Sequence, residues 1–120
     1  LPSTSHPMDV LRTAVSALGC LEPEPEPATS DAQDRIAERL IASLPSMLMY
    51  WYQFAHHGQQ IDTGVQDDSV AGHFLHLLYG HMPNATQQRA VDVSLILYAE
   101  HEFNASTFTA RITTSTARAW

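Results

Sequence analysis

The sequence predicts an all-α protein. Three observations point to this fold class: apolar residues recur at helical spacing, glycine or proline separates the helical segments, and no strand pattern occurs apart from the short β-branched run 112–114. A chain of 120 residues can form one small domain or a part of a larger one. We therefore expect one group of packed helices.

The first helix is predicted over about residues 6–18. Pro7 suits the first helical position, where a proline loses no needed donor, and the Ser5 hydroxyl can cap the helix. Gly19 is the expected end. The apolar stripe of this helix consists of Met8, Leu11, Ala14, Val15 and Leu18.

An acidic, proline-rich loop is predicted over residues 21–30. It contains Glu22-Pro23-Glu24-Pro25-Glu26-Pro27, in which the prolines forbid a helix and the like charges extend the backbone. We interpret this segment as a solvated linker rather than a partner-binding motif.

The second helix is predicted over 31–57, with Ser30 as its cap and Gly58 after its end. Pro45 lies inside it and removes one backbone hydrogen bond, so we expect a kink or a short break there. Residues 47–54 are apolar or aromatic on almost every face, which indicates burial on more than one side. A chain this short offers little material for that cover, so missing neighbours are implied.

A third helix is predicted over 69–79, started by Ser69 and ended by Gly80. A fourth is predicted over 86–100, capped by Asn84 or Thr86.

A fifth helix is predicted over 105–111, capped by Asn104 or Ser106. The helical pattern stops after Arg111, so residues 112–120 are expected to form a tail.

Charge and composition exclude several classes of partner. Six Lys and Arg against thirteen Asp and Glu give a net charge of -7, which repels nucleic acid and anionic membranes. The longest apolar run, 44–54, is too short to cross a membrane. A single cysteine, Cys20, and the lack of a secretory signal favour a reducing, cytoplasmic location.

Seven histidines raise the question of a metal site. His73 and His76 have a spacing that two ligands could use, but zinc needs a third and a fourth donor and Cys20 is isolated, so we predict no metal and no cofactor. A metal-binding histidine protein is kept as a hypothesis for titration. His56 and His57 are interpreted as cations at a helix C-terminus. The serines and the cysteine show no nucleophile elbow or recognisable triad.

The junction of the fourth and fifth helices is the best candidate site. His101 stands there, three residues before Asn104, so an imidazole and free backbone N–H groups can meet at one point. Such a point suits a carboxylate or keto acid. The start His101-Glu102 resembles a zinc-protease motif, but the fifth position is Ala105 where a second histidine is needed.

The stretch Tyr98-Ala99-Glu100-His101-Glu102-Phe103-Asn104-Ala105-Ser106 resembles the signature of the citrate synthase family, in the form typical of its bacterial 2-methylcitrate synthase branch. Two further segments, 5–20 and 67–78, resemble family segments in the same order, so the resemblance covers about 5–111. It implies that residues 1–111 form part of the family's large helical domain, and that 112–120 depart from the family.

The resemblance also implies a reaction. Family members condense an acyl-CoA, here propionyl-CoA or acetyl-CoA, with oxaloacetate, and they act as homodimers. His101 is expected to hydrogen-bond oxaloacetate, and Asn104 to shape the same pocket. The family's aspartate base and enol-stabilising histidine lie downstream, whereas this sequence has no histidine after His101 and no aspartate after Asp92. We therefore expect a fragment that contains no catalytic residue and is inactive alone.

A second hypothesis needs no catalysis. The apolar segment 47–54 could make the chain a helical interaction module that associates through its apolar faces.

Overall fold

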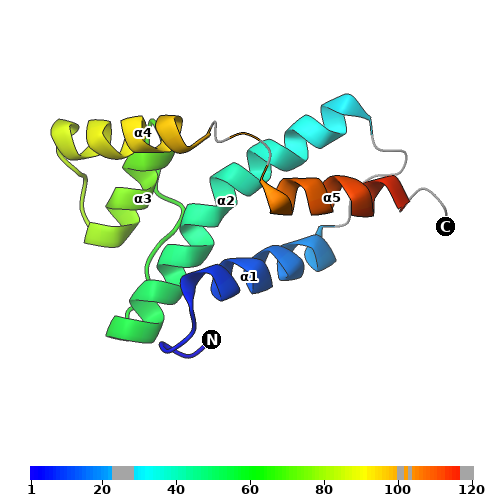
Figure 1. The fold of residues 1–120 in the computed structure, drawn as a ribbon. Helices are drawn as coiled ribbons and strands as arrows, with labels where there is room; N and C mark the ends of the chain where they lie inside the picture. The colour runs from blue at the N-terminus through cyan, green and yellow to red at the C-terminus, as the bar shows by residue number, and fades with distance from the viewer. Residues whose placement is uncertain (23–28, 100–101, 103, 117–120) are drawn as a thin grey trace.

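The computed structural model describes residues 1–22, 29–99, 102 and 104–116, and within them it contains five α-helices and no strand. The all-α prediction is confirmed. Most of the acidic, proline-rich loop lies outside the described residues. In chain order the helices, shown in Figure 1, are α1 (Pro7–Leu21), α2 (Ser30–His57), α3 (Val70–Tyr79), α4 (Ala85–Ala99) and α5 (Ala105–Thr116).

The helix α1 differs from the prediction at both ends. His6, not Ser5, is its cap, because the Nδ1 atom of His6 accepts a hydrogen bond from the Met8 N–H at 3.2 Å. The helix also continues past Gly19, whose φ is not positive. A glycine inside a helix costs only about 1 kcal/mol relative to alanine, so it does not stop a helix that packs on a neighbour.

The sequence predicts a kink or a short break at Pro45. The helix α2 runs unbroken through Pro45, so the break is wrong, and the kink stays a prediction. Proline removes one backbone hydrogen bond, and packing of α1 and α3 on α2 offsets that loss. The cap is Thr29 rather than Ser30, since the Thr29 hydroxyl accepts from the Ala32 N–H at 3.3 Å. The predicted ends of α2 and α3 are confirmed: Gly58 and Gly80 have φ of 67° and 72°, a conformation that favours glycine.

The core lies where α1 and α3 pack on α2 (Figure 1). Within α1, Val10 is buried and Met8 is 63% exposed, the reverse of what the predicted stripe implies for these two residues. Ala14 and Leu18 are half-buried at four-residue spacing from Val10, which is the ridge of side chains that one helix sets into the groove of another. The buried apolar residues are Val10, Ala32, Met49, Trp51, Ala71, Leu75 and Leu77.

One buried polar residue joins α2 to the end of α3. Gln53 is 7% exposed, and its amide Nε2 donates to the carbonyls of Leu77 and Leu78 at 3.0 and 2.9 Å. The last carbonyls of a helix have no partner within the helix, so this side chain satisfies two acceptors that burial would leave unpaired.

The helix α4 packs on α3 through a close contact at Gly72. The Gln88 amide of α4 donates to the Ser69 hydroxyl at 3.0 Å, and a Cβ on Gly72 would lie 3.3 Å from the same amide nitrogen. A side chain at this position would require Gln88 or Ser69 to shift by a few tenths of an ångström.

The helices α4 and α5 contain no buried residue, and α5 packs on no other helix within the described part of the chain. The radius of gyration, 16.3 Å, exceeds the value of about 13–14 Å for a compact domain of this length. The large apolar side chains that these helices expose are Val93, Leu95, Ile96, Leu97, Tyr98, Phe108 and Ile112.

The helix α5 extends to Thr116, beyond the end predicted at Arg111. The β-branched residues there favour a strand, but their hydroxyls donate to carbonyls of the preceding turn: Thr113 to the Thr109 carbonyl at 3.0 Å and Thr114 to the Ala110 carbonyl at 2.8 Å. Threonine is tolerated in a helix when its hydroxyl makes this bond. Among the described residues, no helix is long and apolar enough to span a membrane.

Candidate functional site

The predicted site lies between α4 and α5. His101 falls outside the described residues, so its predicted role stays a prediction. Asn104 is the cap of α5: its side-chain oxygen accepts from the Thr107 N–H at 2.9 Å and from the Thr107 hydroxyl at 3.1 Å. Of the two caps considered, Asn104 or Ser106, the structure uses Asn104.

Glu102 stands between His101 and Asn104 in the sequence. Its φ is 59°, the one positive φ of a non-glycine residue in the described chain. A glutamate in this conformation is costly, by about 1–2 kcal/mol, and such values collect at functional sites. This left-handed residue lies at the position where the sequence places the candidate site.

A second group of polar residues lies between α2 and α3, where the sequence predicts no site. Asp67 precedes α3, and its side chain is 1% exposed. One carboxylate oxygen lies 3.2 Å from Nδ1 of His73, and the other lies 3.1 Å from Nδ1 of His76. The two histidines thus share one carboxylate.

His73 also reaches α2. Its Nε2 atom lies 2.9 Å from the hydroxyl of Ser46, the residue after Pro45. Ser46, His73 and Asp67 form a continuous hydrogen-bonded chain of hydroxyl, imidazole and carboxylate. The sequence shows no recognisable triad, because Ser46 and His73 are 27 residues apart.

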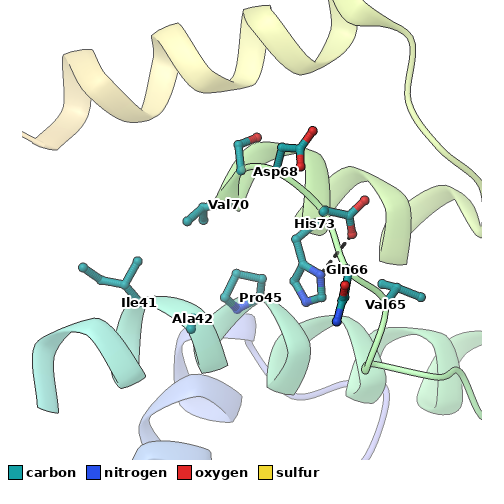
Figure 2. Close-up of a pocket in the computed structure, with 10 residues that line it drawn as sticks. Ile41, Ala42, Pro45, Val65, Gln66, Asp68, Val70 and His73 are labelled. Atoms are coloured by element: carbon teal, nitrogen blue, oxygen red, sulfur yellow. Dashed lines mark hydrogen bonds and ion pairs between the residues drawn. The ribbon is translucent and has the colours of Figure 1, made fainter. Parts of the chain in front are cut away.

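A groove of about 630 Å³ lies beside this chain of side chains. Figure 2 shows His73 pointing from α3 toward α2, with Pro45 on one side and Gln66 on the other. The groove has acidic and apolar walls: its lining residues are Ile41, Ala42, Pro45, Val65, Gln66, Asp67, Asp68, Ser69, Val70 and His73.

Sequence reasoning missed this group because its members are 21 and 6 residues apart, on different elements. The weak signal was His73 on a short helix directly after the acidic pair Asp67-Asp68. No group of three or more His, Cys, Asp or Glu residues in the described ranges is arranged to hold a metal ion.

His56 and His57 lie in the last turn of α2, as predicted. They also contact aromatic rings of the same helix, with ring centres 5.0 Å apart for Tyr52 and His56 and 5.4 Å apart for Tyr52 and His57. These contacts support a structural role for both histidines.

Comparison with known proteins covers nearly the whole chain. A model of the family "Citrate synthase, C-terminal domain" matches residues 1–119, so the boundary predicted at Arg111 is not a boundary of the family match. A 2-methylcitrate synthase of Shewanella oneidensis is 55% identical over 116 residues, which are 97% of this chain and 30% of the relative.

Of two further relatives, one is named a citrate synthase and the other a 2-methylcitrate synthase. A citrate synthase of Deinococcus radiodurans is 44% identical over 97% of this chain and 30% of its own length. A 2-methylcitrate synthase 1 of Corynebacterium glutamicum is 40% identical over 97% of this chain and 32% of its own. The chain thus spans about a third of the length of these relatives, and it belongs to the citrate synthase family.

Proposed function

We propose that this chain supplies part of the oxaloacetate site of a 2-methylcitrate synthase, an acyltransferase that condenses propionyl-CoA with oxaloacetate. The observation that supports the proposal most is the 55% identity to a 2-methylcitrate synthase over 97% of the chain. Acetyl-CoA and citrate are the alternative substrate and product, because a citrate synthase is also a close relative.

His101 is proposed to donate a hydrogen bond to oxaloacetate. Asn104 is proposed to fix the wall of the same pocket, since its side chain sets where α5 begins. The N–H groups in the first turn of α5 would then face an anion, and a helix N-terminus favours negative charge.

The 120 residues alone are proposed to be inactive. Condensation needs a base at the acyl α-carbon and a donor to the enol oxygen, and this sequence has no aspartate after Asp92 and no histidine after His101 to match the family's groups. We further propose that the whole enzyme is a cytoplasmic homodimer of propionate catabolism that needs no cofactor, metal, nucleic acid or membrane.

A thiol-release assay with oxaloacetate and either acyl-CoA tests the proposed inactivity. We expect no turnover above that of the His101→Ala variant. Turnover well above this control would contradict it. Oxaloacetate binding is tested separately by NMR titration. We expect shifts of the amide signals of Ala105 and Ser106 that His101→Ala abolishes, because the N–H groups of Thr107 and Phe108 already donate to Asn104. The absence of these shifts in the parent chain would contradict the site.

An interaction module without catalysis is the second candidate. The observation that favours it is the exposure of consecutive apolar residues at the end of α4, where Ile96, Leu97 and Tyr98 are 65%, 72% and 79% exposed. Exposed apolar patches of this kind mark contact surfaces. Light scattering distinguishes the candidates, because a monomer at all concentrations argues against the module.

A further inference from the structure

The hydrogen-bonded chain between α2 and α3 has the order of groups that activates a serine. The Ser46 hydroxyl lies 2.9 Å from Nε2 of His73, and Nδ1 of the same ring lies 3.2 Å from an Asp67 oxygen. Asp67 is 1% exposed at its side chain and His73 17%, so both act in surroundings with little water.

The contacts define which ring nitrogen carries the proton. An ionised carboxylate only accepts hydrogen bonds, so the hydrogen of neutral His73 must be on Nδ1, where it donates to Asp67. The Nε2 lone pair then accepts from the Ser46 O–H. His76 donates to the second Asp67 oxygen, which fixes the carboxylate in place.

Space for a reactant is present on both sides of this contact. His73 lines the groove of about 630 Å³ shown in Figure 2. Ser46 lines a second hollow of about 370 Å³, together with Ala14, Met47, Tyr50 and Thr63. The other residues that line this hollow are two apolar side chains and two with hydroxyls, Tyr50 and Thr63, and none is charged, which fits a short acyl group better than a charged one.

We propose that Ser46 is a nucleophile activated by His73 and Asp67, and that it takes the acyl group of a small activated ester. In the step, the Ser46 oxygen attacks the ester carbonyl while its proton passes to Nε2 of His73. The carbon–oxygen bond to the leaving group then breaks, the alcohol departs with a proton from Nε2, and an acyl-serine remains. The proposal is independent of the site at His101.

The position of Ser46 inside a helix limits the rate of its acylation. Backbone N–H groups in a helix interior are used in the helix itself, so they are not free to stabilise the oxyanion that forms during attack. General-base assistance alone contributes about 10²–10⁴-fold. We therefore expect slow, stoichiometric acylation rather than rapid turnover.

The test treats the full 120-residue chain with p-nitrophenyl acetate and records both p-nitrophenolate release and the acylated peptide by mass spectrometry. We expect one acetyl group on the peptide that contains Ser46. Ser46→Ala should abolish this label, and His73→Gln should slow it about 100-fold, which is the lower end of general-base assistance. Ser43→Ala is the matched control, because Ser43 lies one turn earlier on α2 and bonds only the Arg39 carbonyl.

Circular dichroism of each variant shows whether the helices persist, and the parent chain in urea gives the reactivity of the unfolded serine. The proposal is overturned if the folded chain acquires no label at Ser46. It is also overturned if the labelling rate in folded protein equals that in urea, or if His73→Gln labels as fast as the parent while its helices persist.

Discussion

The helices α1 to α3 contain buried residues, whereas the helices α4 and α5 contain none. Every buried apolar residue of the described chain belongs to α1, α2 or α3. The last two helices bury none, although they carry the most specific family motif and Asn104. The chain's stability and its family signature therefore reside in different regions.

This difference follows from what each helix can cover. The helices α1 and α3 each pack their apolar faces against α2. The Gln53 amide hydrogen-bonds the last carbonyls of α3. In α4 the apolar residues Leu95, Ile96 and Leu97 point around the helix rather than along one stripe, so one neighbour cannot bury them all. Such a helix needs cover from several sides, as the interior of a larger domain provides.

The largest effect is expected from a cavity in the packed region. Leu75 is 3% exposed, and Leu75→Ala should lower the free energy of unfolding by about 2–5 kcal/mol. Leu97 is 72% exposed, and the same change there should cost less than about 0.5 kcal/mol. Urea unfolding followed by far-UV circular dichroism measures both. If both changes lower the free energy of unfolding equally, Leu97 of α4 is buried in solution, and the contrast between the two regions is wrong.

The buried carboxylate gives the next largest effect. Asp67→Ala leaves the Nδ1 hydrogens of His73 and His76 without their acceptor, which should cost about 2–3 kcal/mol. Asp68→Ala, at an exposed neighbour, is the control and should change little. The same urea titration applies. If Asp67→Ala lowers the free energy of unfolding only slightly, water replaces the carboxylate as the acceptor for the two histidines.

The amide of Gln53 should contribute somewhat less. Gln53→Ala leaves the Leu77 and Leu78 carbonyls unpaired, at a cost of about 1–2 kcal/mol, and hydrogen exchange at the end of α3 should speed up with it. Gln59→Ala, in the exposed loop after α2, serves as control. If exchange at the end of α3 stays at the parent rate, the two carbonyls have other partners.

The sequence predicted the helices well where local signals agree, and less well where packing decides. Gly58 and Gly80 end helices because each adopts a positive φ that only glycine takes easily. Gly19 and Pro45 carry the same kind of signal, yet α1 and α2 continue through them, because contacts between helices outweigh a cost that acts on one residue.

The polar contacts at the two candidate sites also differ in whether local sequence or helix packing determines them. The cap of α5 could be narrowed to Asn104 or Ser106 from the sequence, since an N-cap bond spans only three residues, and the structure uses Asn104. The contact of Ser46 with His73 could not be predicted in this way, because it joins residues 27 positions apart and depends on how α3 lies on α2. Neither residue has a local pattern that marks the pair.

The smallest effect is expected at Asn104, and it tests the second half of the comparison directly. Replacing a helix cap by alanine costs about 1 kcal/mol, but α5 packs on no other described helix, so that cost should stay within α5. Asn104→Ala should therefore speed amide exchange at Thr107 and Phe108 and leave the urea midpoint unchanged. Ser106→Ala is the matched control, because Ser106 was the other candidate cap and should leave both quantities as they are. A shift of the midpoint by Asn104→Ala would mean that α5 unfolds together with α1 to α3, and the two regions would then form one cooperative unit.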